Sequence, residues 1–140
     1  MTRKDFSLSI AAFGLLLAAG PVAAHHSFSA EFDADKPVTL RGTVTKVEWT
    51  NPHAWIHLDV KGEDGQVTAW KIEAGAPNAL LRRGFTKSYL PPGTDIVVEG
   101  FRAKDGSNRA NGASVTTPDG KKLFLGSSGT GAPYEEKGGK

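Results

Sequence analysis

Apolar and polar residues alternate along much of the middle of this 140-residue sequence, and a period of two predicts β-strands with one buried face. The longest run of this kind covers residues 37–49. Its predicted inner face is made of small and apolar residues at even positions: Val38, Leu40, Gly42 and Val44. The apolar phase then slips by one residue, because Val47 and Trp49 are odd-numbered. A phase slip within one long strand predicts a bulge or a strong bend.

Further alternating segments follow, and one predicted helix interrupts them. The expected strands are 37–49, 54–60, 67–73, 94–102 and 111–117, with a short closing strand at 121–125. Pro77 suits the first turn of a helix, and Gly84 suits its C-terminal cap. Five strands with a helix between the third and fourth form the element order of an OB-type barrel. We therefore predict an all-β fold with small helical content, an OB-like barrel of five to six strands, although other small barrels and meanders share this order.

The N-terminus has the three parts of a secretory signal peptide. A short basic start is followed by an apolar segment at 8–19, and the small residues Val22 and Ala24 precede the expected cut. The apolar segment is shorter than the roughly 20 residues that a membrane-spanning helix needs. We therefore expect a periplasmic or secreted protein that has lost residues 1–24, with cleavage after Ala24 or one residue earlier and no membrane span afterwards.

Composition excludes several classes of function. The sequence contains no cysteine, which excludes disulfides, cysteine-ligated zinc and a lipid attached through cysteine. The 17 basic and 15 acidic residues nearly balance, so we expect no nucleic-acid partner. No spacing typical of a catalytic triad, a carboxylate pair or a phosphate loop is present, and we expect a protein without enzymatic activity. The expected organisation is an N-terminal arm at 25–36, the barrel domain at 37–125 and a disordered tail at 126–140.

The histidines are the candidate metal ligands. They are His25, His26, His53 and His57. Cleavage after Ala24 would place an α-amine and an imidazole on one terminal residue, a pair of nitrogen ligands that suits Cu(II). An arm folded back over the barrel would bring these imidazoles together around copper, or around zinc. The carboxylates that could orient an imidazole are Glu31, Glu48 and Asp59. Histidines in strands and loops more often only hydrogen-bond their neighbours, and this alternative stays open.

A binding module without metal is the alternative function. The residues proposed for its ligand site are Arg41, Trp49, Asn51 and Trp55. An outward-facing tryptophan would stack on a sugar, a peptide or an aromatic ligand, or contact a partner protein. The competing expectation is that the arm covers this face, with Phe28 and Phe32 packed on Trp55. The sequence does not determine the oligomeric state.

Several short motifs together carry a family resemblance. They are His25-His26-Ser27-Phe28, Gly42-Thr43-Val44, Trp49-Thr50-Asn51-Pro52-His53-Ala54-Trp55, Pro77-Asn78-Ala79-Leu80 and Gly100-Phe101-Arg102-Ala103-Lys104-Asp105-Gly106. With them the chain resembles a family of exported bacterial proteins catalogued as a domain of unknown function. The resemblance covers roughly residues 25–125. It implies a small, exported, β-rich protein and carries over no established catalytic residue.

Overall fold

The computed structural model describes residues 28–126 and 130–136, which contain six β-strands and three short helices. The strands are β1 (Phe32–Glu48), β2 (Trp55–Lys61), β3 (Val67–Glu73), β4 (Asp95–Ala103), β5 (Arg109–Thr116) and β6 (Lys122–Phe124). The helices are α1 (Phe28–Glu31), α2 (Pro77–Arg82) and α3 (Pro133–Glu136). None of these helices has the length and apolar character that a membrane-spanning helix requires.

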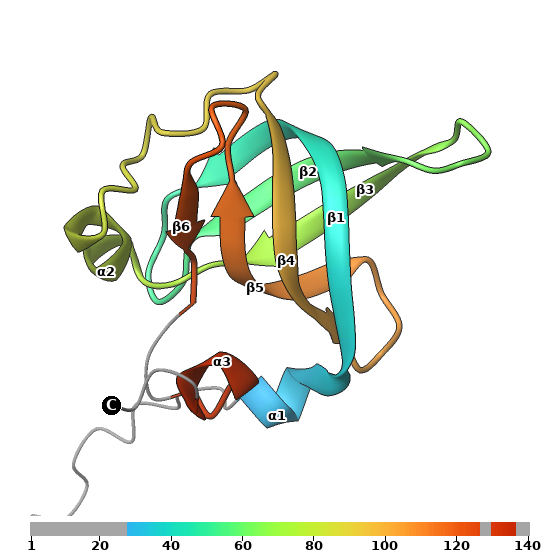
Figure 1. Ribbon diagram of the computed structural model, residues 1–140. Coiled ribbons are helices and arrows are strands. Elements are labelled where there is room, and N and C mark those ends of the chain that lie inside the picture. The colour runs from blue at the N-terminus through green and yellow to red at the C-terminus, as the bar shows by residue number, and fades with distance from the viewer. Residues whose placement is uncertain (1–27, 127–129, 137–140) are drawn as a thin grey trace, which may run out of the picture.

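The strands close into a ring, drawn in Figure 1. Their order is β3-β2-β1-β4-β5-β6, and β3 also pairs with β5. That closing contact is parallel and joins Lys71–Glu73 to Arg109–Asn111, whereas the other pairs are antiparallel. The predicted all-β class with small helical content is confirmed, and α2 lies between β3 and β4 in the chain as expected.

The long first strand contributes to both halves of the ring. Residues 32–43 of β1 pair with β4, and residues 43–48 pair with β2. The register against β2 shifts between Val44 and Lys46, which confirms the irregularity that the phase slip predicted. A bulge of this kind increases the local twist, so that one strand can turn from one partner to the next.

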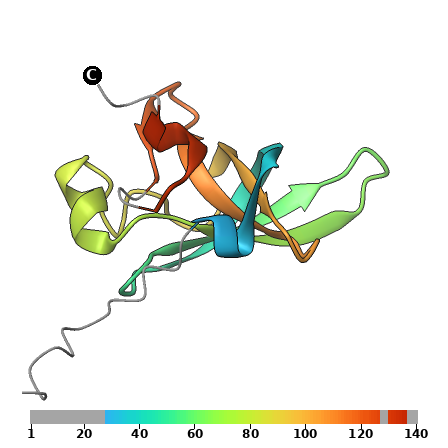
Figure 2. The same ribbon diagram turned by 90° about the horizontal axis from the view of Figure 1, so that it is seen from below.

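The interior of the ring is filled by the inward faces of the strands and by the segment around α2. The buried apolar side chains are Leu40, Val44, Ala54, Ile56, Leu58, Ile72, Ala74, Leu80, Phe85, Leu90, Ile96, Val98, Ala110, Val115 and Leu125. Each fully buried Leu, Ile or Phe stabilises the fold by roughly 1.5–3 kcal/mol relative to an exposed one. Beyond the ring, the β2–β3 hairpin projects into solvent (Figure 2), and Val67 near its tip is 62% exposed.

A second apolar cluster joins the two ends of the described chain below the ring. It is formed by Phe28, Phe32, Ala103 and Ala132, with Phe101 and Tyr134 packed against it. The amide of Phe28 also donates a hydrogen bond to the carbonyl of Thr130 (2.8 Å). The sequence-based expectation of a disordered tail at 126–140 is therefore wrong for residues 130–136, because a buried alanine and a tyrosine anchor them.

The N-terminal arm also differs from the expectation. Phe28 packs edge-on against Phe101, with ring centroids 5.4 Å apart, and β1 already begins at Phe32 rather than at residue 37. The expected packing of Phe28 and Phe32 on Trp55 is wrong, because both rings are taken up by the second cluster.

Gly100 provides a test of the ring. It lies on β4 where the register against β5 shifts, and a Cβ added there would lie 2.1 Å from the carbonyl oxygen of Asn111. Because that oxygen belongs to a strand of the ring, Gly100→Ala should lower the free energy of unfolding by about 1–3 kcal/mol, measured by urea denaturation. The control, Val67→Ala, should change it by less than about 0.5 kcal/mol. Equal losses in the two variants would contradict the close packing at Gly100.

Candidate histidine site

His53 lies in the turn between β1 and β2, two residues before β2 begins. The Asn51–Pro52 peptide bond in this turn is cis. The carbonyl of His53 accepts a hydrogen bond from Oγ1 of Thr50 (3.1 Å). Its neighbour Ala54 exchanges backbone hydrogen bonds with residues 74 and 75 (2.9 and 3.0 Å). Backbone contacts on both sides therefore hold His53 beside the end of β3.

The side chain of His53 is held by a buried carboxylate. Its Nδ1 contacts Oε1 of Glu73, the last residue of β3, which is only 7% exposed. Burial raises the pKa of the Glu73 carboxyl, and the charge of Glu31 raises it further. His53, a hydrogen bond from the side chain of Asn111, and Arg109 act in the opposite direction and lower this pKa. The carboxyl group of Glu73 is therefore buried and lies against the imidazole of His53.

This contact determines which nitrogen of His53 is available. A neutral imidazole carries one N–H and one lone pair. Because Nδ1 contacts the carboxylate, the proton belongs on Nδ1 and the lone pair on Nε2. Histidines that bind metals in proteins are oriented in this way, with the second ring nitrogen donating to a carboxylate or a carbonyl. The chemistry that the arrangement supports is therefore ligand binding through Nε2.

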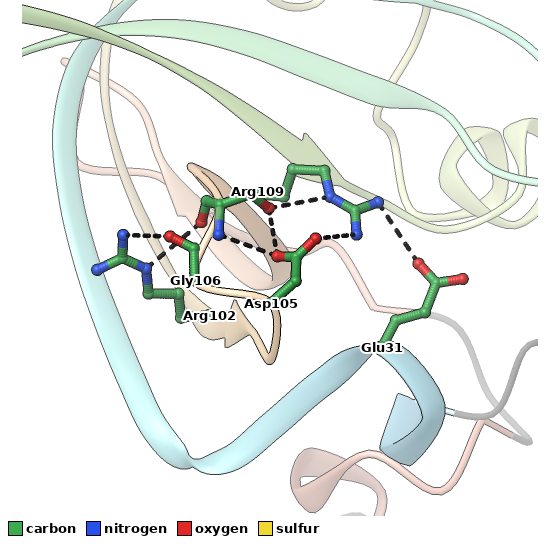
Figure 3. Close-up of polar contacts among 6 residues, drawn as sticks. Glu31, Arg102, Asp105, Gly106 and Arg109 are labelled. Carbon is green, nitrogen blue, oxygen red and sulfur yellow. Dashed lines mark hydrogen bonds and ion pairs between the residues drawn. The ribbon is translucent and has the colours of Figure 1, made fainter.

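Arg109 contacts the N-terminal helix α1 next to this site, as Figure 3 shows. Nη1 of Arg109 lies 3.5 Å from Oε2 of Glu31 on α1, and Nη2 lies 3.7 Å from Oδ2 of Asp105. Arg102 donates a hydrogen bond to the carbonyl of Gly106 (2.9 Å) in the same β4–β5 turn. Because Arg109 pairs with Lys71 across the contact of β3 with β5, two residues from Glu73, the start of the described chain lies near the end of β3.

His57 has a different carboxylate partner. Its Nε2 lies 3.2 Å from Oε1 of Glu48, but the alignment does not form a hydrogen bond. Glu48 also pairs with Lys46 (3.0 Å) and Lys71 (3.6 Å), and the hydrogen bond from Lys46 is the main cause of its lowered pKa. His53 and His57 therefore belong to two separate polar groups.

The predicted convergence of all four histidines is not seen in the described part of the chain. Residues 28–126 and 130–136 contain no group of three metal-binding side chains. His25 and His26 lie outside the described residues. Of the carboxylates expected to orient an imidazole, Glu48 contacts His57, whereas His53 is held by Glu73. Glu73 was missed because its role depends on the pairing of β2 with β3, which places it opposite Trp55.

The four residues proposed as a ligand site have different surroundings in the described structure. The Nζ of Lys71 lies over the ring of Trp55, 4.5 Å from the centroid of that ring. Trp49 instead stacks on Phe85 against the core, and Asn51 is exposed in the turn. Arg41 lines a separate groove of about 400 Å³. Among the described residues no hydrogen bond, ion pair or ring contact joins these four side chains, and a single ligand site built from them stays a prediction.

The described residues thus define a small all-β protein whose ring of strands presents a histidine held by a buried carboxyl group. Comparison with protein families agrees with the resemblance noted in the sequence. A model described as "Family of unknown function (DUF6152)" matches residues 12–113, and the chain belongs to this family. Searches of curated proteins and of solved structures each gave no match.

The carboxyl of Glu73 should make stability depend on pH. Its ordinary pKa is 4.5, and the pKa is raised in the folded protein, so the folded state holds this proton more tightly than the unfolded state. The resulting stabilisation is complete below about pH 4.5 and is lost as the pH rises through the raised pKa. The free energy of unfolding of the wild type, measured with urea from about pH 4 to 8, should therefore fall relative to that of Glu73→Gln. A difference that stays constant over this range would contradict the raised pKa.

Proposed function

We propose that this protein is exported and binds a transition metal ion, with Cu(II) as the preferred ion, through Nε2 of His53 and the histidines at the mature N-terminus. The observation that carries the proposal is the contact of Nδ1 of His53 with the buried carboxyl of Glu73. This contact orients the ring and leaves its other nitrogen for a ligand. The proposed role is binding, as in metal storage, delivery or sensing, rather than catalysis.

The N-terminal ligands come from His25 and His26, which lie three and two positions before Phe28, the first described residue. Phe28 lies three positions after His25, and an extended segment of three residue steps reaches about 10 Å. Glu31 on α1 pairs with Arg109 (3.5 Å), which lies on β5 next to the end of β3. The reach of the N-terminal residues and the position of α1 together support a ligand set that includes His53. In this proposal His57, which lies beside Glu48 instead, is not a ligand.

The donor set favours copper. A terminal histidine offers its α-amine and its imidazole, and His53 would add a third nitrogen. Among divalent first-row ions Cu(II) binds such nitrogen sites most tightly. The sequence provides no cysteine, and its single methionine is Met1, which the expected signal cleavage removes. Nitrogen ligands therefore suit Cu(II) better than Cu(I), which prefers sulfur.

The first test asks whether the protein is exported and whether its signal peptide is cleaved at the expected bond. The full-length chain, expressed in a bacterium with a periplasm, should accumulate in the periplasm or the medium and begin at His25. Intact-mass measurement and N-terminal sequencing would establish the first residue. A product that starts at Ala24 would keep a copper-binding terminus, whereas a protein that retains residues 1–24 in the cytoplasm would contradict the proposal.

Copper binding itself is tested by calorimetric titration of the mature protein with Cu(II). His53→Ala should weaken binding at least tenfold, about 1.4 kcal/mol, because one of the nitrogen ligands is lost. His57→Ala is the matched control and should bind as the wild type does, since His57 contacts Glu48 instead. Unchanged affinity in His53→Ala would reduce the site to the general affinity of a terminal His-His sequence and would overturn the proposal.

A second candidate function is the binding of a small organic ligand or a partner protein without metal. It is supported by the groove of about 400 Å³, whose charged lining residues are Arg41, Asp59, Lys61 and Asp95. Asp95 accepts a hydrogen bond from Thr43 (2.6 Å) in this groove. Absence of copper binding by the wild type at neutral pH would favour this function over the first.

A further inference from the structure

The groove of about 400 Å³ lies where β2 separates from β1. The pairing of β1 with β2 ends at Thr43 and Asp59, whereas β2 continues beside β3 as far as Lys61 and β1 continues beside β4. Residues from β1, β2 and β4 and from segment 116–118 line the groove. Its volume lies in the range of roughly 300–1,000 Å³ that is typical of small-molecule sites. The groove therefore has the size of a site for a small ligand.

The acidic residues of the groove form a row across three strands. Thr43 of β1 pairs with Asp59 of β2 on one side and with Asp95 of β4 on the other. Their neighbours Leu58 and Ile96 are buried, so the alternation of side chains directs both carboxylates outward. Two strand spacings, about 10 Å, separate the backbones of the two aspartates. A cationic group of a ligand therefore fits between the two carboxylates.

The basic residues form the next row. Arg41 comes two residues before Thr43 on β1, and Lys61 comes two residues after Asp59 on β2. Because β1 and β2 are antiparallel, both steps lead to the same side of the acidic row, and the two rows are about 6.5–7 Å apart at the backbone. A Cβ added to Gly42 would lie 2.6 Å from the carbonyl oxygen of Asp59, so the two strands are still in contact between the rows.

The charges of the two rows are available to a ligand. Among residues 28–126 and 130–136, no ion pair joins Arg41 or Lys61 to either aspartate of the groove. All four charged side chains are exposed, and a ligand that binds them displaces water without breaking an ion pair. The arrangement is complementary to a molecule that carries a cation and an anion about 7 Å apart.

From this arrangement we infer that the groove binds a short peptide by its free termini, with the ammonium group between Asp59 and Asp95 and the carboxylate at Arg41 and Lys61. In an extended dipeptide the two terminal charges are separated by about two residue lengths, roughly 7 Å, which matches the spacing of the rows. This ligand class rests on the second candidate function proposed above, and it does not depend on metal binding.

The first measurement compares ligands on the unaltered protein by titration of its amide chemical shifts at about pH 7, where both termini of a peptide are charged. Ala-Ala should shift the amides of residues 41–43, 59–61 and 95–97. Free alanine, whose charges are one residue length apart, should bind at least about threefold more weakly, because it loses one of the ion pairs. The neutral analogue N-acetyl-Ala-Ala-amide should also bind at least about threefold more weakly.

Charge-removing variants assign the two ends of the peptide. Asp59→Asn should weaken binding of Ala-Ala by about threefold or more and leave binding of N-acetyl-Ala-Ala, which has no cation, unchanged. Arg41→Gln should weaken binding of Ala-Ala equally and leave that of Ala-Ala-amide, which has no anion, unchanged. Glu63→Gln and Lys87→Gln are the matched controls, since these exposed residues lie outside the groove. Both controls should bind every ligand as the wild type does.

Several results would overturn the inference. They are the absence of shifts in the groove with millimolar Ala-Ala, equal affinity for free alanine or for the neutral analogue, and equal losses in the control variants. Equal affinity for the neutral analogue would still identify a ligand site in the groove, so the second candidate function would stand without the charged ligand. Arg41→Gln should bind copper as the wild type does, because the metal-binding proposal depends on His53 instead.

Discussion

The parallel contact between β3 and β5 is the interaction on which the rest of the structure depends. It closes the ring and aligns Lys71–Glu73 with Arg109–Asn111. Without it, the end of β3 would be an open edge, and Glu73 would be a solvated surface carboxylate. With it, Glu73 is buried beside Asn111 and His53. The same pairing that completes the core therefore creates the polar site, because both use the last three residues of β3.

The two ends of the described chain meet on this closed ring. Phe28 and Ala132 share the second apolar cluster, Glu31 pairs with Arg109, and Tyr134 reaches Asn111. Apolar burial holds the ends in place, and polar contacts direct them toward the end of β3. Local segments that would be unstable alone are thus ordered by contacts with the ring.

Much of the fold followed from local patterns. Alternation located the strands to within a few residues, and the phase slip near Val44 located the irregularity of β1. Less of the site could be predicted from the sequence, although His53 was identified as a candidate from its place after a turn. Glu73 could not be paired with it, because that contact depends on the register of β2 against β3. Asn111 could not be placed there either, because β3 and β5 are neighbours in the ring but not in the chain. The glycine-rich C-terminus also led to a wrong prediction of disorder for residues 130–136, which a single buried alanine and Tyr134 anchor.

By itself, the sequence determined the all-β class, the order of the elements, the inward faces of the strands and membership of an uncharacterised family. Periodicity and turn residues act over a few positions, so these features can be derived from local chemistry. Only the tertiary structure decided that His53 is held by Glu73, that His57 is paired elsewhere, and that Tyr134 reaches the site. The contact of His57 with Glu48 depends on the register of β1 against β2, and that of His53 with Glu73 on the register of β2 against β3. Asn111, which Tyr134 contacts, comes next to Glu73 only through the closure of the ring, and none of these relations is set by local preference.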